Sequence, residues 1–211
     1  GSREALQAAE WAAARAKLNN AQLQLVCAYA LPSYTAASME SGFAVIDNDV
    51  IRASAQTVVD ETLTHLAKLG YQAEGRVEPG DPTAVLVQLA EQADLIVVGT
   101  RGTGGFADRL LGATSSALPA YARSQVVVFP GRGADQQFTP VNKIGIGVVV
   151  SRRSRKSLRR ASEEAALGGA QLTAVDAVPM ASSAGVLAWL PATVDRESIL
   201  RDVRDELKAI C

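Results

Sequence analysis

Hydrophobic and polar positions follow two periods in turn along this chain, which predicts alternating helices and strands. Residues 3–18 and 49–69 follow the helical period, whereas residues 22–29 and 71–77 alternate as strands do. Gly70 is the expected stop of the second helix. The candidate core positions of the two helices are Leu6, Trp11, Ala14 and Leu18, and then Ile51, Ala55, Val58, Thr62, Leu66 and Leu69.

The stretch from residue 81 to residue 129 predicts two more helices and two more strands. Asp81 is followed by Pro82, a helix cap and a proline suited to the first helical turn. Residues 94–99 form an apolar run typical of a buried strand, and residues 125–129 predict the last strand. Between them we expect a glycine-rich loop at 100–112 and a helix to about Arg123, bent at Pro119.

The second half of the chain repeats the alternation after a linker. Residues 131–142 lack apolar periodicity, so we predict a domain at 1–130, a linker at 131–142 and a partial second domain at 143–211. The second domain predicts strands at 143–150 and 171–177 and helices at 154–167 and 195–209. Alternating strands and helices indicate an α/β fold, an open parallel sheet with helices on both faces.

Two short matches in the same order predict a tandem repeat. The segment Ser2-Arg-Glu-Ala-Leu resembles Ser154-Arg-Lys-Ser-Leu, 152 positions later, and Ala21-Gln-Leu matches Ala170-Gln-Leu, 149 positions later. The difference of one helical turn predicts a shorter helix in the second repeat. The first repeat starts at its helix and the second stops before its glycine loop, so we expect a piece of a chain of about 300 residues.

Composition and charge exclude several classes of protein. The 211 residues carry 21 Lys and Arg against 22 Asp and Glu, and this balance argues against a nucleic-acid partner. No stretch approaches the ~20 apolar residues of a membrane span, and no secretory signal is visible. Cys27, Cys211 and the single His65 predict neither a disulfide framework nor a metal site. We therefore expect a cytoplasmic protein with no membrane partner.

The segment with readable chemistry is the glycine-rich loop, which holds five glycines between residues 99 and 112. In open α/β sheets ligands bind where strands end, and the first turn of the following helix offers free N–H groups to anions. No Walker A motif is present, and Gly102-Thr-Gly-Gly-Phe-Ala107 lacks the acidic residue that a dinucleotide site needs. The pattern predicts phosphate or nucleotide binding; the alternative is a loop that only turns the chain.

The spacing Gly99-x2-Gly102-x9-Gly112 resembles the motif of the universal stress protein family. The strand before it and Gln125-Val-Val-Val-Phe after it extend the resemblance over nearly all of the first repeat, and the tandem arrangement fits as well. The resemblance implies a five-stranded parallel α/β fold. It also implies ATP, or AMP or ADP, as the ligand, with Mg²⁺ as an optional companion.

The resemblance assigns roles by position. Gly99 would face the ribose, Gly102 the phosphates, and Ala28 would offer its backbone to adenine. Gly112 and the N–H groups after it would hold phosphate at the start of the helix. The implied nucleotide-binding set is Ala28, Gly99, Thr100, Arg101, Gly102, Gly112, Ala113, Thr114 and Ser115.

Two departures from the family pattern change the expected site. The family motif has Ser or Thr after its third glycine, whereas this chain has Ala113, so Thr114 or Ser115 is expected to supply the hydroxyl. The family's first strand ends in an Asp, and Val149 aligns with that place in the second repeat. Either the second repeat has lost nucleotide binding or the sequence is interrupted there.

These observations favour a stress-response protein that binds an adenine nucleotide and acts by regulation rather than catalysis. No catalytic residue is identified, because no motif places a nucleophile beside His65. The alternatives are a structural or interaction protein of the same fold that binds no nucleotide, or a slow ATPase. The expected assembly is a homodimer or an intramolecular pairing of domains. The basic run at 152–160 is interpreted as a solvated face or as a patch for phosphate or an acidic partner.

Overall fold

The computed structural model describes residues 1–30, 47–102, 111–130, 141–149 and 152–176, together with 201, 202, 204, 205 and 208. The chain divides into two compact units, Gly1–Gln136 and Gln137–Cys211. The expected loop at 31–48, most of the glycine loop, the linker and the helix expected at 195–209 lie wholly or largely outside the described residues.

Strands and helices alternate in both units. Unit 1 contains α1 (Arg3–Asn19), β1 (Gln24–Tyr29), α3 (Asn48–Lys68), β2 (Glu74–Pro79), α4 (Pro82–Leu89), β3 (Leu95–Gly99), α5 (Ala113–Tyr121) and β4 (Gln125–Phe129). Unit 2 contains β5 (Lys143–Gly147), α6 (Arg152–Gly168) and β6 (Gln171–Val175). This order confirms the α/β class expected from the two periods.

All strand pairs in the described residues are parallel. In unit 1, β1 pairs with β2 and β3 pairs with β4, the latter from Leu95 opposite Gln125 to Gly99 opposite Phe129. In unit 2, β5 pairs with β6. Within the described part of unit 1 the strands form two separate two-stranded sheets. The single five-stranded sheet and the tandem repeat therefore stay predictions.

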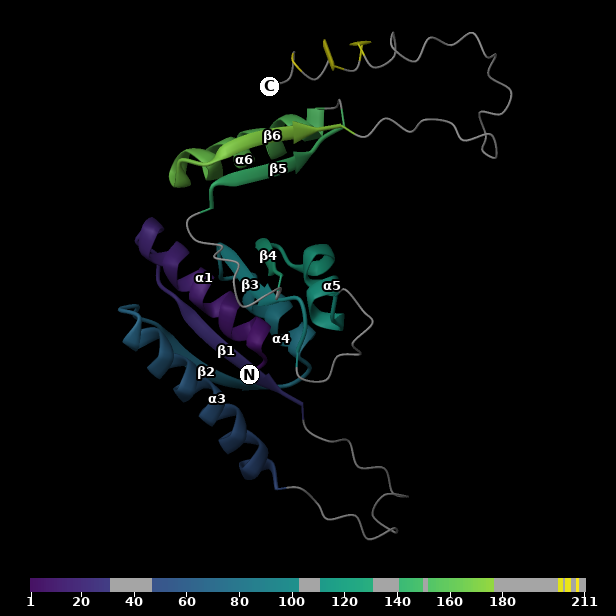
Figure 1. Cartoon of the computed structure of the whole chain (residues 1–211). Coiled ribbons are helices and arrows are strands. Elements are labelled where there is room, and N and C mark those ends of the chain that lie inside the picture. Colours follow the sequence, from purple (N-terminus) through teal and green to yellow (C-terminus); the bar gives the residue numbers. More distant parts are fainter. Residues whose placement is uncertain are drawn as a thin grey trace, which may run out of the picture. The chain divides into compact units, whose positions relative to one another are not determined.

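The helices of unit 1 hold its two strand pairs together. Helix α3 packs on β1 and β2, whereas α1 packs on β3 and β4 and also touches α3 (Figure 1). Helix α4 contacts β1 and α5, and α5 contacts β4. Helix α1 contacts both β3 and α3, and α4 contacts both β1 and α5. These contacts fix β3 and α5 relative to β1, β2 and α3.

Local signals predicted several helix ends correctly. The Asp81 carboxylate accepts the N–H groups of Thr83 and Ala84 at the start of α4, with Pro82 in the first turn. At the end of α3, Gly70 has φ 78°. Its N–H donates to Ala67 O, and the N–H of Tyr71 donates to Leu66 O. This capping motif uses the Tyr71 N–H. Strand β2 therefore begins at Glu74 rather than at the expected residue 71.

The predicted length difference between the two repeat helices is wrong. Helices α1 and α6 both contain 17 residues, and α6 begins at Arg152 rather than at residue 154. Ser2 caps α1 by accepting the N–H of Ala5. Its counterpart in the repeat, Ser154, lies within α6, and its hydroxyl bonds to the carbonyl of Val149. The two serines therefore have different hydrogen-bonding roles despite the matching sequence.

The core lies on a different face of α1 than the candidate positions indicate, whereas in α3 it lies on the predicted face. Helix α1 buries Ala8, Ala12 and Ala13, whereas Leu18 is 67% exposed. Small alanines at the contact allow α1 to lie close to β3. Helix α3 buries Ala55, Val59 and Leu66, but Leu69 is 50% exposed. Periodicity predicted both helices and two of the three buried residues of α3, Ala55 and Leu66, but it did not select the buried residues of α1.

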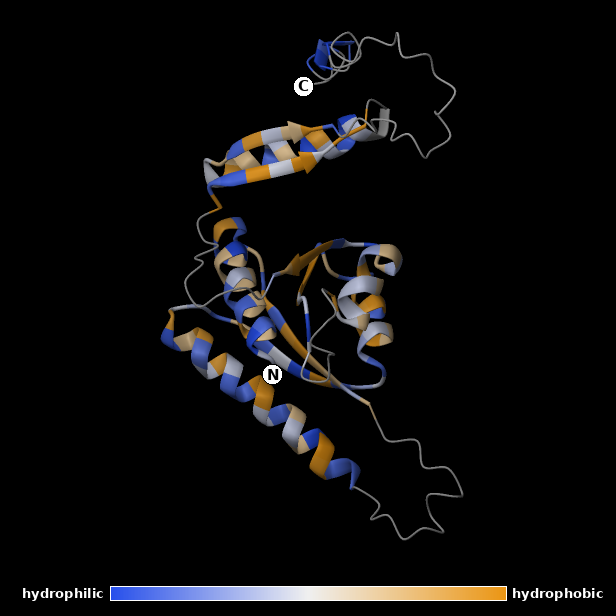
Figure 2. Ribbon diagram, turned by 45° about the vertical axis from the view of Figure 1, so that its right-hand side comes forward, coloured by the Kyte–Doolittle hydropathy of each residue, from blue (hydrophilic) through white to orange (hydrophobic). Residues whose placement is uncertain are grey.

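A hydrophobic cluster joins β3 to α5 and to the end of α4. Ile96 of β3, Leu118 of α5 and Ala90 just after α4 are buried, and Leu118 has no exposed surface. In Figure 2 some strands carry hydrophobic colour along most of their length, whereas α3 alternates between hydrophilic and hydrophobic stretches. This cluster packs α4 and α5 against β3 and so sets where the first turn of α5 stands.

Candidate functional site

The site is centred on Thr100, the residue between β3 and the glycine loop. Its N–H donates to the carbonyl of Phe129 in β4 at 3.0 Å. Its carbonyl accepts the N–H of Gly112 at 2.7 Å and the hydroxyl of Ser115 at 2.9 Å. The two ends of the loop that spans residues 101–111 are therefore joined at their base, directly beside the end of a buried strand.

Ser115 is turned into the protein rather than toward the loop's open side. Its side chain is 3% exposed, and its Oγ lies 2.9 Å from Thr100 O and 3.1 Å from Gly112 O. A hydroxyl has one hydrogen, so the two carbonyl oxygens share it. This hydroxyl is one of the two expected to contact phosphate. In the structure it is instead hydrogen-bonded to backbone carbonyls at both ends of the loop.

The start of α5 presents backbone donors without a capping side chain. Gly112 is the N-cap residue and makes no side-chain cap bond. Ser116 donates to Gly112 O, which is the first bond of the helix. The N–H groups of Ala113, Thr114 and Ser115 thus have no acceptor within the helix, and the helix dipole is positive there. Such an end is suited to an anion.

Thr114, the other candidate hydroxyl, contacts helix α4. Its Oγ1 accepts a hydrogen bond of 3.2 Å from Thr83 Oγ1, so the first turns of α4 and α5 are joined. Thr83 was not predicted as a site residue, because no local signal in the sequence connects it with the loop. Thr114 is half-buried, whereas Ala113 beside it is exposed. The position where the family motif has a hydroxyl is therefore accessible in this chain but carries only a methyl group.

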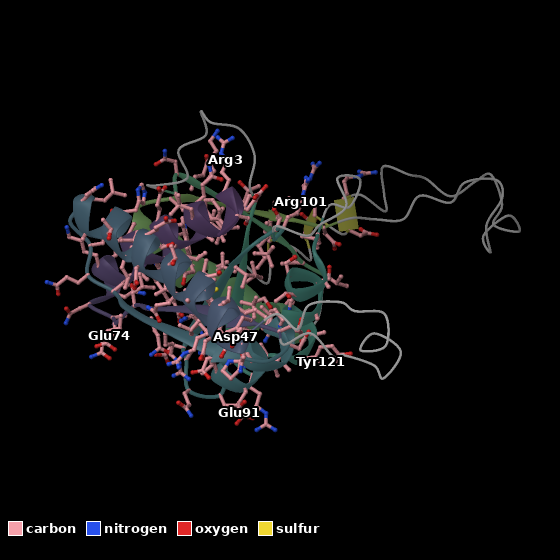
Figure 3. The ribbon with its side chains drawn as sticks, turned by 90° about the horizontal axis from the view of Figure 1, so that it is seen from below. Arg3, Asp47, Glu74, Glu91, Arg101 and Tyr121 are labelled. Carbon is pink, nitrogen blue, oxygen red and sulfur yellow. The ribbon has the colours of Figure 1, made fainter. Side chains whose placement is uncertain are left out.

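Helix α1 contacts the other end of the loop. Ser2 Oγ accepts the N–H of Ala5 as the helix cap and donates to the carbonyl of Arg101 at 2.9 Å. Figure 3 labels Arg101 and Arg3, the residue that follows Ser2 in the chain. The Nε of Arg101 is buried and has no hydrogen-bond partner in the described part of the chain. An unused cationic donor therefore lies where the loop begins.

The three motif glycines have different surroundings. A Cβ built on Gly99 would lie 2.7 Å from the carbonyl carbon of Glu4 in α1, so this glycine permits close packing of a helix. A Cβ on Gly102 would meet nothing within 4 Å, and one on Gly112 would lie 3.4 Å from Thr100 O. The packing role of Gly99 was not predicted, since it depends on a helix more than ninety residues away in the sequence.

The structure gathers eight of the nine predicted site residues at one place. These are Gly99, Thr100, Arg101, Gly102, Gly112, Ala113, Thr114 and Ser115. The ninth, Ala28, lies opposite Glu78 in the β1–β2 ladder. Its contact with adenine stays a prediction, as does the contact of Gly99 with ribose. The glycines at 104 and 105 lie outside the described residues.

Two further features lie away from the loop. His65 Nε2 is 2.6 Å from Glu10 Oε1, which links α3 to α1 through groups the sequence analysis did not pair. A shallow groove of about 390 Å³ runs along α3 beside this pair. Among the described residues, no helix is long and apolar enough to cross a bilayer, and no group of three His, Cys, Asp or Glu side chains could hold a metal ion.

Comparisons with known proteins assign a family to this parallel α/β unit. The model of the universal stress protein family matches residues 1–130. That match covers more than half of the chain, so the chain belongs to the universal stress protein family.

Individual relatives agree with this assignment. A universal stress protein of Mycolicibacterium smegmatis is 32% identical over 181 residues, covering 82% of this chain and 60% of the relative. Universal stress protein Rv1996 of Mycobacterium tuberculosis is 27% identical over 188 residues, covering 81% of this chain. The chain spans 60% and 58% of the lengths of these two relatives. Universal stress protein UspA from Lactobacillus plantarum shares the fold, with a TM-score of 0.53 at 22% identity over 61% of this chain and 91% of that one.

Proposed function

We propose that unit 1 binds an adenine nucleotide, with its phosphates at the base of the glycine loop and at the start of α5. The observation that supports this most is the set of N–H groups of Ala113 to Ser115, which have no acceptor within the helix and follow a glycine cap. These donors and the positive end of the helix dipole favour a negatively charged group. Arg101 adds a buried Nε that has no partner in the described residues.

The glycines of the loop leave room for the ligand. Gly102 is exposed, and a Cβ there would have nothing within 4 Å, so its backbone is open to an approaching phosphate. The adenine base and the ribose follow from family membership, with Ala28 and Gly99 as the expected contacts. When ATP is the ligand, Mg²⁺ would enter with the phosphates, which supply oxygen ligands of the kind it prefers.

The proposed role is regulatory. Bound nucleotide would favour one arrangement of the loop between Arg101 and Leu111 and thereby bias a surface that a partner binds. No residue of the site is assigned to catalysis. The proposal includes the expectation of a cytoplasmic stress-response protein that works as a homodimer or through pairing of its own domains.

The direct test is thermal unfolding of the full chain with AMP, ADP and ATP, each with and without Mg²⁺. A ligand that binds only the folded state stabilises it by RT ln(1 + [L]/Kd), which is about 2.7 kcal/mol at a hundredfold excess over Kd. We expect a rise in Tm with at least one nucleotide. No rise with any of them would support a structural protein instead, and release of phosphate over hours would indicate a slow ATPase.

We expect Ala113→Ser to tighten nucleotide binding several-fold. A serine at this position could donate its hydroxyl to phosphate, and a hydrogen bond to a charged group contributes roughly 1.5–3 kcal/mol net. Because the position is exposed, we expect the lower part of this range. Titration calorimetry with ATP measures the change in Kd. Ala120→Ser, an exposed position near the end of the same helix, is the matched control and should leave Kd unchanged. Equal affinities for both variants would contradict a phosphate at the start of α5.

A further inference from the structure

Ser115 stands out among the described residues because its polar side chain is buried. Its exposure is 3%, and it lies one turn before Leu118, which is fully buried. A buried hydroxyl costs free energy unless it is hydrogen-bonded, and alanine would fit the same apolar surroundings without that requirement. Both partners of this hydroxyl are backbone carbonyls of the loop base, Thr100 O and Gly112 O.

These two carbonyls stand on opposite sides of the glycine loop. Thr100 precedes the loop and Gly112 ends it, so a single hydroxyl from the interior contacts both ends. A backbone bond from Gly112 N to Thr100 O also joins these two ends. Gly112 has extended backbone angles, φ −75° and ψ 169°, and no side chain of its own to hold them. The hydroxyl of Ser115 therefore holds the residue from which the free N–H groups of α5 begin.

We propose that the side chain of Ser115 positions the nucleotide site: its hydroxyl touches no ligand but keeps the loop base in the geometry that presents the α5 donors to phosphate. This inference rests on the proposed nucleotide-binding function. Without the hydroxyl, the base loses the hydrogen bonds of Ser115 to Thr100 O and Gly112 O and samples other arrangements more often. The apparent Kd then rises in inverse proportion to the fraction of molecules that stay competent to bind.

A positioning role has a kinetic signature that differs from direct contact. Loss of a contact to the ligand acts mainly on the dissociation rate. Loss of preorganisation lowers the population that can bind, so the association rate falls while dissociation from the correctly formed site stays the same. A residue that serves stability alone would change neither rate while the protein remains folded.

The test compares Ser115→Ala and Ser115→Cys with Ser116→Ala in the full chain. Cysteine keeps nearly the volume of serine but is a weak donor, so it removes the hydrogen bonds without a large cavity. Ser116 is the exposed neighbour on the same helix and serves as the matched control. Calorimetry gives Kd for ATP, stopped-flow with a fluorescent ATP analogue gives both rates, and Tm confirms folding.

We expect both Ser115 variants to bind ATP about five- to tenfold more weakly, through slower association with unchanged dissociation, as for a conformational pre-equilibrium. Ser116→Ala should match the wild type. Wild-type affinity in a folded Ser115 variant would overturn the positioning role, and a loss confined to faster dissociation would indicate direct contact and overturn it as well.

A second readout needs no ligand. Amide hydrogen exchange at Gly112 reports on its bond to Thr100 O, which we expect to open more often in both Ser115 variants than in Ser116→Ala. Unchanged exchange at Gly112 would overturn the role of the hydroxyl in holding the loop base. If the wild-type chain binds none of the nucleotides, the proposed function fails and the positioning of nucleotide fails with it. If the wild type binds nucleotide and the Ser115 variants bind it equally well, the positioning role is wrong while the proposed function stands.

Discussion

We expect Gly99→Val to destabilise unit 1 by about 3 kcal/mol or more, because a side chain at this position has no space. A Cβ on Gly99 would lie 2.7 Å from the carbonyl carbon of Glu4 and 2.9 Å from its oxygen. These are backbone atoms in the first turn of α1, so no rotamer change relieves the overlap. Helix α1 would have to move off β3, and it contacts both β3 and β4.

Chemical denaturation of the full chain measures this loss. A domain is stable by only about 5–15 kcal/mol, so the predicted change is a large part of the total. The matched control is Gly75→Ala, at which the added Cβ would meet side chains rather than backbone: Val59 Cγ1 and Leu63 Cδ1. Side chains can repack in part, so we expect a smaller loss there. A Gly99→Val protein as stable as the wild type would contradict the packing of α1 on β3.

We expect Gly102→Val, the same substitution three residues further on, to leave stability unchanged and to weaken nucleotide binding by more than about tenfold, or ~1.4 kcal/mol. A Cβ on Gly102 meets nothing within 4 Å, and its φ lies outside the left-handed region, so a branched side chain is tolerated by the fold. The same side chain would occupy the space through which phosphate approaches the backbone.

Calorimetry with ATP and denaturation, carried out on the same preparation, separate the two effects. Gly145→Val in unit 2 is the control, since a Cβ on Gly145 also meets nothing within 4 Å and the residue lies in β5, outside unit 1. It should change nucleotide affinity little. Unchanged affinity in Gly102→Val would show that phosphate does not approach this glycine and would remove the loop from the proposed site.

Several predictions from the sequence are confirmed because the signals behind them are local. The strand at 125–129 was predicted to the residue, and the Asp81 cap and the Gly70 stop were confirmed. An apolar run, a capping carboxylate or a glycine that tolerates positive φ acts within a few residues. The local sequence is therefore enough to predict these elements and their ends. The start of β2 was wrong by three residues because the cap of α3 uses the Tyr71 N–H for its own closure.

The sequence by itself determined the alternation of elements, the parallel α/β class, the position of the glycine loop and family membership of unit 1, because periodicity and motif spacing are written along the chain. Tertiary structure alone decided which face of α1 is buried, why Gly99 has no room for a side chain and which way Ser115 points. Each of these depends on a partner far away in sequence: β3 for α1, Glu4 for Gly99, and Thr100 for Ser115. Such contacts follow from how the elements pack, and no short-range pattern encodes them.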